Sequence, residues 1–315
     1  MNKPAFTFPG QGSQAVGMGR DLADSFAEAR AVFEEVDDAL GLKLSAIMFD
    51  GPEDTLRLTE NAQPALMAAS IAVVRVLDAR GVKVAEAASH VAGHSLGEYS
   101  ALCAAGTFSL SDTARLLQIR GRAMQQAVPV GQGAMAALLG LDMDVVKEIA
   151  AEAAQGEVCD VANDNSPGQV VVSGNLAAID RAIEIAKARG ARRALALPVS
   201  APFHCALMAP AAEAMREALG NVDMKAPSVP LVANVLARPI SDTQEIRTRL
   251  VEQVTGMVRW TESVSWLAKE AGVTELYELG TGKVLTGLAK RIDPALSGQA
   301  VGTAQDIEAF IAARG

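Results

Sequence analysis

The sequence predicts an α/β protein with a mainly parallel sheet as its core and a smaller β-α-β-β-α-β unit inserted into it. Short apolar runs alternate with amphipathic helical patterns along most of the chain, an order typical of parallel sheets covered on both faces. The middle third instead places two strand patterns next to each other, as in a ferredoxin-like unit. With 315 residues, half of them apolar, the chain is long enough for two domains. We expect a core of residues 1–127 and 199–315 and an insertion of residues 128–198.

The first part of the core alternates strands with helices. A short buried strand at 5–8 leads into the Gly-rich loop 9–14, and an apolar strand at 90–94 precedes helix-forming residues at 96–105. Gly81 has the residue type favoured just after a helix end. The remaining helices of this part are predicted at about 20–40, at 62–80, and from a Ser111 cap to about 127.

The insertion has its own order of elements. A turn is predicted at 163–168, which is rich in Asn, Asp, Pro and Gly. Its strands are predicted at 134–139, 158–162, 170–173 and 193–197, and its helices from Asp142 or Asp144 to about 154 and at 176–189. After it the core resumes with helix 206–218, strand 231–235, helices 243–254 and 260–271, strand 276–279 and a helix from 283.

Composition excludes several classes of protein. A net charge of −9 and 4% aromatic residues disfavour a nucleic-acid binder. Three scattered cysteines are too few for a disulfide framework or a zinc site, so we expect no metal and a reducing compartment. The charge-free runs 123–141 and 194–212 contain prolines, and the N-terminal apolar stretch is too short for a signal peptide. The expectation is a cytoplasmic protein that binds no membrane.

The motif with the clearest chemistry is Gly93-His94-Ser95-Leu96-Gly97. A G-x-S-x-G pattern between an apolar strand and a helix is typical of a strand-turn-helix elbow that exposes a nucleophilic serine. The Leu96 N–H, at the start of the helix, could then donate to an oxyanion. The structural alternative is a Gly-rich turn with an N-capping serine.

A serine nucleophile needs a base, and the chain has three histidines. His94 adjoins Ser95 on the strand side, where neighbouring side chains diverge, and His90 lies on the same apolar strand. His204 lies in an irregular, Pro-interrupted segment and is therefore the candidate base by elimination. A thiol nucleophile at Cys205 is disfavoured, because adjacent side chains seldom face each other.

Other Gly-rich segments carry weaker signals. Gly131-Gln-Gly133 precedes a strand instead of following one, which argues against a dinucleotide site. Gly280-Thr-Gly282-Lys283 lacks the flanking residues of a P-loop. The loop 8–14 contains two glutamines whose amides could donate hydrogen bonds to developing charge, but by itself it is a turn.

Together these motifs resemble the malonyl-CoA:acyl carrier protein transacylase family, from Phe8 to about Ile292. The resemblance implies a hydrolase-like α/β core with a ferredoxin-like insertion, and ping-pong transfer of malonyl from malonyl-CoA to the phosphopantetheine thiol of acyl carrier protein in fatty acid synthesis, with no cofactor. The motifs are FPGQGSQ at 8–14, GHSLGEYSAL at 93–102, NSPGQVVVSG at 165–174, LPVSAPFHCALM at 197–208 and ELGTGKVLTGL at 278–288.

The resemblance also implies roles for single residues. It makes Ser95 the acylated nucleophile, and His204 the general base. Arg120 would bind the malonyl carboxylate, a role that suits a planar guanidinium; the alternative is a solvated helix face, where Arg122 is expected. The remaining implied roles are oxyanion donation by Gln11 and the Leu96 N–H, and orientation of the histidine by the main-chain carbonyl of Gln253.

Two rival classes are an α/β-hydrolase esterase or thioesterase and a non-catalytic binding module. The hydrolase order places histidine near the chain end and an HGGG-type loop nearby, whereas here 111 residues follow His204 and HGGG does not occur. A binding module leaves Ser95 and Gln11 unexplained. We expect a monomeric enzyme.

The partner surface is predicted from charge. An acidic carrier needs a local basic patch on this acidic protein. The densest cluster of cations contains Lys187, Arg189, Arg192 and Arg193. For Lys187 and Arg189 the alternative explanation is that they stabilise the C-terminal end of the preceding helix. Arg189, Arg192 and Arg193 are therefore the candidate carrier-docking residues.

Overall fold

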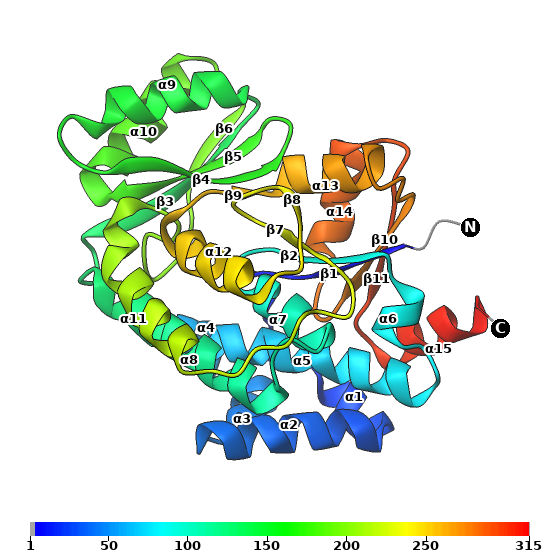
Figure 1. Cartoon of the computed structure of the whole chain (residues 1–315). Helices are drawn as coiled ribbons and strands as arrows, with labels where there is room; N and C mark the ends of the chain where they lie inside the picture. Colours follow the sequence, from blue (N-terminus) through cyan, green and yellow to red (C-terminus); the bar gives the residue numbers. More distant parts are fainter. Residues whose placement is uncertain (1–3, 315) are drawn as a thin grey trace.

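The structure, a computed structural model, describes residues 4–314 and contains a six-stranded and a five-stranded sheet (Figure 1). The six-stranded sheet has the order β11-β10-β1-β2-β7-β8, and its strands pair in parallel except for the antiparallel β8. The predicted α/β class with a mainly parallel sheet is confirmed. The strands are β1 (Ala5–Phe8), β2 (His90–Gly93), β7 (Leu231–Ala233), β8 (Arg238–Ile240), β10 (Glu275–Leu279) and β11 (Ser297–Val301).

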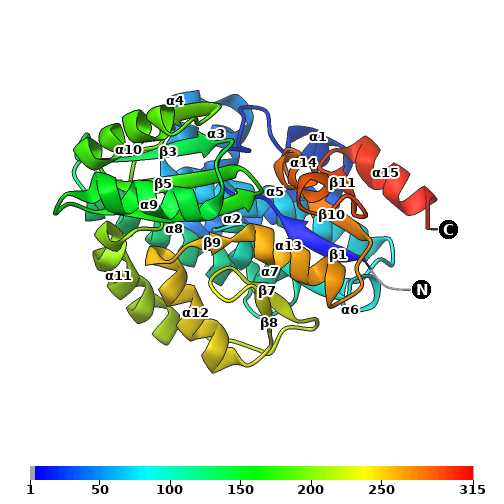
Figure 2. The ribbon, with the colours of Figure 1, turned by 90° about the horizontal axis from the view of Figure 1, so that it is seen from above.

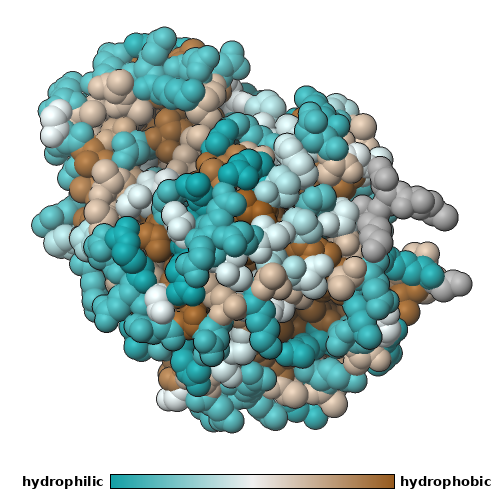
Figure 3. All heavy atoms as spheres, viewed as in Figure 1, coloured by the Kyte–Doolittle hydropathy of each residue, from teal (hydrophilic) through white to brown (hydrophobic). Residues whose placement is uncertain are grey.

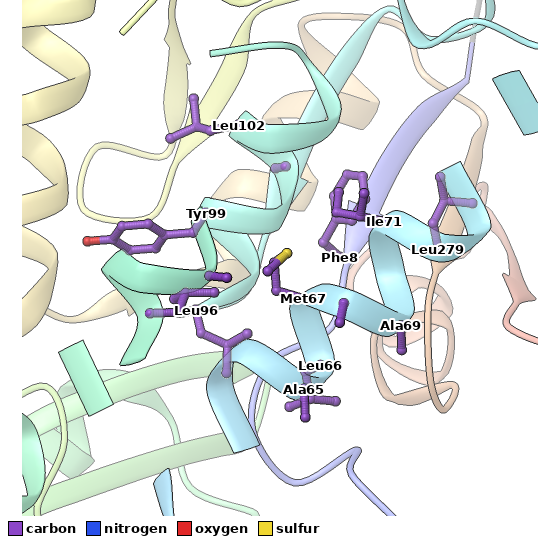
Figure 4. Close-up of a cluster of buried hydrophobic side chains, with 14 of the residues drawn as sticks. Phe8, Ala65, Leu66, Met67, Ala69, Ile71, Leu96, Tyr99, Leu102 and Leu279 are labelled. Atoms are coloured by element: carbon purple, nitrogen blue, oxygen red, sulfur yellow. The ribbon is translucent and has the colours of Figure 1, made fainter. Parts of the chain in front are cut away.

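Helices cover both faces of this sheet because alternate strand residues point to opposite sides. Phe6 and Phe8 belong to the core on one face, where Figure 4 shows Phe8 beside Ile71 of the long core helix, whereas Ala5 belongs to the core on the other face. On the first face α5 (Thr59–Ala79) and α7 (Gly97–Ala104) contact the sheet, and α2 (Ala27–Leu40) and α8 (Leu110–Ala127) pack on α5. On the second face lie α13 (Trp260–Lys269) and α14 (Val284–Ile292).

The five-stranded sheet has the order β6-β3-β5-β4-β9 and its own apolar core, with α9 and α10 over one face (Figure 1). Along the chain its elements follow the order β-α-β-β-α-β, and β9 (Val258–Arg259) then adds in parallel to β4. Its other elements are β3 (Gly133–Leu139), α9 (Met143–Ala154), β4 (Cys159–Ser166), β5 (Gln169–Asn175), α10 (Leu176–Ala188) and β6 (Arg193–Ala196).

The two sheets lie side by side when the molecule is seen from above (Figure 2), with α11 (Ala209–Gly220) and α12 (Thr243–Thr255) packed together beside them. A short 3₁₀ turn, Ala206–Met208, precedes α11, where the sequence predicts one continuous helix from 206. The remaining elements are α1 (Arg20–Ser25), α3 (Leu44–Asp50), α4 (Glu53–Arg57), α6 (Val84–Ala87) and α15 (Ala304–Ala312).

Several predicted boundaries are wrong for local reasons. The helix predicted at 20–40 is divided at Phe26, whose backbone is extended and whose ring is buried. The N-cap of α8 is Ser109, whose hydroxyl accepts from the Asp112 N–H, and not Ser111. Most importantly, β4 continues through Asn163–Ser166, so the predicted turn at 163–168 is only Pro167-Gly168.

Hydropathy alone would make α5 a membrane candidate. Among the described residues it is the one helix long and apolar enough to cross a membrane, but 83% of its apolar window is buried inside the protein. The face in Figure 3 is mostly hydrophilic, with hydrophobic residues in small groups. The apolar character of α5 therefore reflects its place in the core, between the sheet and α2 and α8.

Candidate active site

Ser95 lies in the sharp turn between β2 and α7, with a φ of 54° in the left-handed region. The turn requires two glycines, because a Cβ on Gly93 would lie 1.9 Å from the carbonyl oxygen of Gly97, and one on Gly97 would lie 2.3 Å from that of Phe8. The Asn234 side chain, just after β7, accepts a 2.8 Å hydrogen bond from the Ser95 N–H. The serine is thus held at the carboxyl edge of the parallel strands, where α/β proteins commonly bind ligands.

His204 is in direct contact with this serine. Its Nε2 lies 2.7 Å from Ser95 Oγ, and its Nδ1 lies 2.8 Å from the carbonyl oxygen of Gln253 and 3.1 Å from that of Gly256. Because a carbonyl only accepts, Nδ1 carries the proton and Nε2 presents its lone pair to the serine. Burial, and then the charge of Arg120, lower the pKa of His204 to about 3, so the imidazole is neutral at pH 7.

Arg120, on α8, places a buried guanidinium beside the same serine. Its Nη1 donates to Gln63 Oε1 at 2.7 Å, and its Nη2 donates to Gln253 Oε1 at 2.8 Å and to Ser95 Oγ at 3.2 Å. Burial lowers the pKa of Arg120. Arg122, two residues further on, is exposed and pairs with Glu60, as expected for a solvated face.

The guanidinium of Arg120 lacks a direct counter-charge. None of the ion pairs within residues 4–314 includes it, and its neighbours at hydrogen-bond distance are neutral groups. The Glu98 carboxylate acts on this charge only from the far side of the Gln253 amide, and a buried cation with no anion in direct contact is costly. An acidic substrate group entering the site would supply that partner.

Gln11 and Leu96 line the same cavity as Ser95. Gln11 follows β1, the strand next to β2, and its Oε1 accepts a 3.0 Å hydrogen bond from the Thr59 hydroxyl. This bond occupies the acceptor end of the amide, and its N–H groups remain as donors. Leu96 is the N-cap of α7, so its N–H belongs to the groups without a partner inside the helix.

These residues line one cavity of about 380 Å³, to which the five-stranded sheet and the loops that follow β1 and β2 all contribute. Glu53 and Arg57 of α4 are among the residues that line it. Asn163 and Asn165 of β4 reach it because that strand is longer than the sequence predicts. The apolar wall is formed by Met135, Val171, Leu197, Val199 and Phe203.

The other histidines and Cys205 have structural surroundings. His94 Nε2 lies 2.8 Å from Asn165 Oδ1 and its ring packs on Trp260, while His90 packs on Trp266. Cys205 is fully buried, its thiol donates to a backbone carbonyl, and burial raises its pKa. None of them faces Ser95 Oγ as His204 does.

Four residues around the Ser95–His204 pair are absent from the predicted set: Gln63, Glu98, Asn234 and Gly256. Glu98 and Gln63 are polar positions within apolar helical stretches, a pattern that signals a buried polar group in need of partners. Asn234 and Gly256 have no comparable signal, because their contribution depends on where loops distant in sequence come together.

The predicted docking residues differ in their surroundings. Arg189 pairs with Glu148 at 2.7 Å and with Glu152 at 2.5 Å, so its charge is compensated. Arg192 and Arg193 are exposed and form no ion pair within the described chain. The uncompensated charge of the predicted patch is therefore at these two residues.

Comparison with known proteins gives a uniform result. Residues 5–271 match the family model described as acyl transferase domain. The malonyl CoA-acyl carrier protein transacylase of Escherichia coli K12 is 48% identical over 301 residues, 96% of each chain. The crystal structure of an acyl-carrier-protein-S-malonyltransferase from Bartonella henselae superposes with a TM-score of 0.96 at 58% identity, covering 98% of this chain and 99% of the other.

A second similar structure is a malonyl-transacylase in complex with a type II polyketide acyl-carrier protein. It has a TM-score of 0.95 and 45% identity, and the match covers 99% of both chains.

The low pKa of His204 makes stability depend on pH. Because about 3 in the folded protein lies below the ordinary value of 6.5, the unfolded chain binds the proton first, and stability is lost as the pH falls from 6.5 toward 3. In His204→Gln the new amide can still donate to the Gln253 carbonyl but cannot titrate. When the pH falls from about 7.5 to about 5, we expect the free energy of unfolding of this variant to decrease by about 2 kcal/mol less than that of the parent. Denaturant unfolding of both proteins at the two pH values measures this difference, and equal losses would contradict it.

Proposed function

The chain belongs to the acyl transferase family and, within it, to the malonyl CoA-acyl carrier protein transacylases, and we propose that Ser95 and His204 perform the transfer through a malonyl-serine intermediate. The observation that supports this most directly is the 2.7 Å contact between Ser95 Oγ and His204 Nε2, with Arg120 at 3.2 Å from the same oxygen. The proposal thus rests on a hydroxyl, an imidazole and a guanidinium that line one cavity.

The first half-reaction loads the enzyme. Ser95 Oγ attacks the thioester carbonyl of malonyl-CoA while its proton passes to His204 Nε2. The N–H groups of Leu96 and Gln11 donate to the oxyanion. When the intermediate collapses, the C–S bond breaks, and the departing CoA sulfur takes the proton from His204.

The second half-reaction repeats these steps in the other direction. The phosphopantetheine thiol of acyl carrier protein gives its proton to His204 and attacks the malonyl-serine ester. The C–O bond to Ser95 breaks, and Ser95 Oγ recovers the proton. The Gln253 carbonyl stabilises the imidazolium in each half, because it accepts from Nδ1.

Arg120 selects the acyl group. Its guanidinium can form charge-assisted bonds to the malonyl carboxylate in a buried site. Acetyl groups offer no such partner. We also propose that no metal or cofactor takes part, since nucleophile, base and oxyanion donors are all side-chain or backbone groups, and that the enzyme works as a cytoplasmic monomer with residues 128–198 as an inserted subdomain forming one wall of the site.

The first test of this function is covalent. Mixed with malonyl-CoA, the parent should gain one malonyl mass on Ser95, and Ser95→Ala should gain none. His204→Ala should load about 10²–10⁴-fold more slowly, the usual effect of removing a general base. Quench-flow mass spectrometry measures both, and rapid release of free malonate without an adduct would instead indicate a hydrolase.

The second prediction concerns Arg120. Arg120→Ala should weaken the use of malonyl-CoA by roughly 2–4 kcal/mol in kcat/KM, because a buried charge-assisted pair is lost. The use of acetyl-CoA should hold or rise. Steady-state kinetics with both substrates decide the role of the arginine, and equal losses on the two would assign it to structure alone.

The third prediction concerns the carrier. Arg192→Gln and Arg193→Gln together should leave loading from malonyl-CoA unchanged but slow transfer to the carrier and reduce its salt dependence. Arg189→Gln is the matched control from the same cluster and should have less effect, because Glu148 and Glu152 already compensate its charge. If both half-reactions change alike, or neither changes, the patch is not the docking site.

A further inference from the structure

Glu98 is a buried carboxylate directly behind the nucleophile, and no step above uses it. It lies in the first turn of α7, three residues after Ser95, and is 1% exposed. A buried carboxylate costs folding free energy unless hydrogen bonds compensate it. Its retention inside an apolar helix therefore requires a specific explanation.

The two oxygens of Glu98 contact the two residues that support the catalytic pair. Oε1 accepts a 3.1 Å hydrogen bond from the Asn234 N–H, and Oε2 accepts one from Gln253 Nε2. Asn234 in turn accepts from the Ser95 N–H at 2.8 Å, and the Gln253 carbonyl contacts His204 Nδ1 at 2.8 Å. One carboxylate thus joins the support of the nucleophile to the support of the base.

The orientation of the Gln253 amide depends on this carboxylate. Gln253 Nε2 donates to Glu98 and to the Ser95 carbonyl at 2.9 Å, and its Oε1 accepts from Arg120 at 2.8 Å. An ionised carboxylate has only acceptors, so it matches both donors that face it. A protonated or amide group at position 98 would place a hydrogen against one of them. If Gln253 turned over to relieve this, its NH₂ group would face the guanidinium.

We propose that Glu98, as a carboxylate, is a positioning residue for the acyl transfer: it orients Asn234 and Gln253 so that Ser95, His204 and Arg120 meet in reactive geometry. The inference rests on the proposed function, because it concerns the same site. It adds a buried acid to a reaction centre that otherwise contains a neutral base and a cation.

The proposal has a consequence for the pH dependence of loading. The charged group facing Glu98 is Arg120 of α8, and the other titratable groups near it are Tyr99 on its own helix and His204 beyond Gln253. Burial raises the pKa of Glu98 to about 7, whereas the pKa of His204 is about 3. A fall in loading rate as the pH drops through 7 would therefore report protonation of Glu98.

Ionised Glu98 lowers the stability of the fold, whereas a carboxylate in a structural ion pair raises it. Because the pKa of Glu98 is raised above its ordinary value of 4.5 on folding, its contribution to stability is lost as the pH rises through about 7. At about pH 8 the ionised group thus costs stability, which suits a residue kept for its role in the site.

The test compares Glu98→Gln with Glu278→Gln. Glu278 is an equally buried carboxylate that accepts from the Leu285 and Thr286 N–H groups of α14 and does not line the cavity. The rate of malonyl loading on Ser95 is measured by quench-flow mass spectrometry from about pH 5.5 to about pH 8.5, with thermal unfolding of each protein.

In Glu98→Gln we expect the loading rate at high pH to fall by about 10²-fold, because Asn234 and Gln253 no longer hold Ser95 and His204 in reactive geometry. We also expect the decline in rate near pH 7 to disappear. Its Tm should fall no more than that of Glu278→Gln, which should load at the parental rate. Loading within about threefold of the parent, an unchanged pH profile, or an equal loss in Glu278→Gln would each overturn the proposal.

Two further results keep the outcomes distinct. If Glu98→Gln does not fold, the parental pH profile decides: a decline near pH 7 supports the role of Glu98, and a rate independent of pH down to about 5 overturns it. If the parent forms no malonyl-serine at any pH, the proposed function itself fails, whatever Glu98 does.

Discussion

The close backbone contact at the β2–α7 turn is the constraint on which the site depends. The carbonyl oxygens of Gly97 and Phe8 lie where a Cβ on Gly93 or Gly97 would have to be, so the strand, the helix and β1 can meet only through glycines. This contact forces Ser95 into the left-handed region, an unfavourable conformation for a residue with a Cβ. The Asn234 side chain, held by the Gly93 carbonyl and the Ser95 N–H, offsets part of that cost.

The electrostatics of the site follow from burial. Removing water from His204 favours the neutral imidazole, and two backbone carbonyls on Nδ1 leave Nε2 as the acceptor that a nucleophilic serine needs. The same burial surrounds Arg120 with neutral hydrogen-bond partners. The charge of the guanidinium is therefore available to an incoming carboxylate. Water in the cavity would weaken both effects by screening.

The second sheet completes this environment. Residues of β3, β4 and β5 form the wall opposite Ser95, and β9 joins that sheet to the chain that follows α12. Gln253 and Gly256, which hold His204, lie just before β9. The position of His204 therefore depends on how the two sheets are joined as well as on its own loop.

The sequence by itself determined the α/β class, the alternation of elements and the motif around Ser95, because these depend on local periodicity and on glycines at fixed spacing. Elimination among three histidines also predicted His204, the elbow motif predicted the Leu96 N–H, and family resemblance implied Gln11, Arg120 and Gln253. Only the tertiary structure decided that β4 extends through Asn163–Ser166, because pairing with β5 outweighs the turn preference of Asn and Asp. It alone also decided that Glu98, Asn234 and Gln253 form one network, because hydrogen bonds between residues more than 130 positions apart depend on packing and leave no periodic signal in the chain.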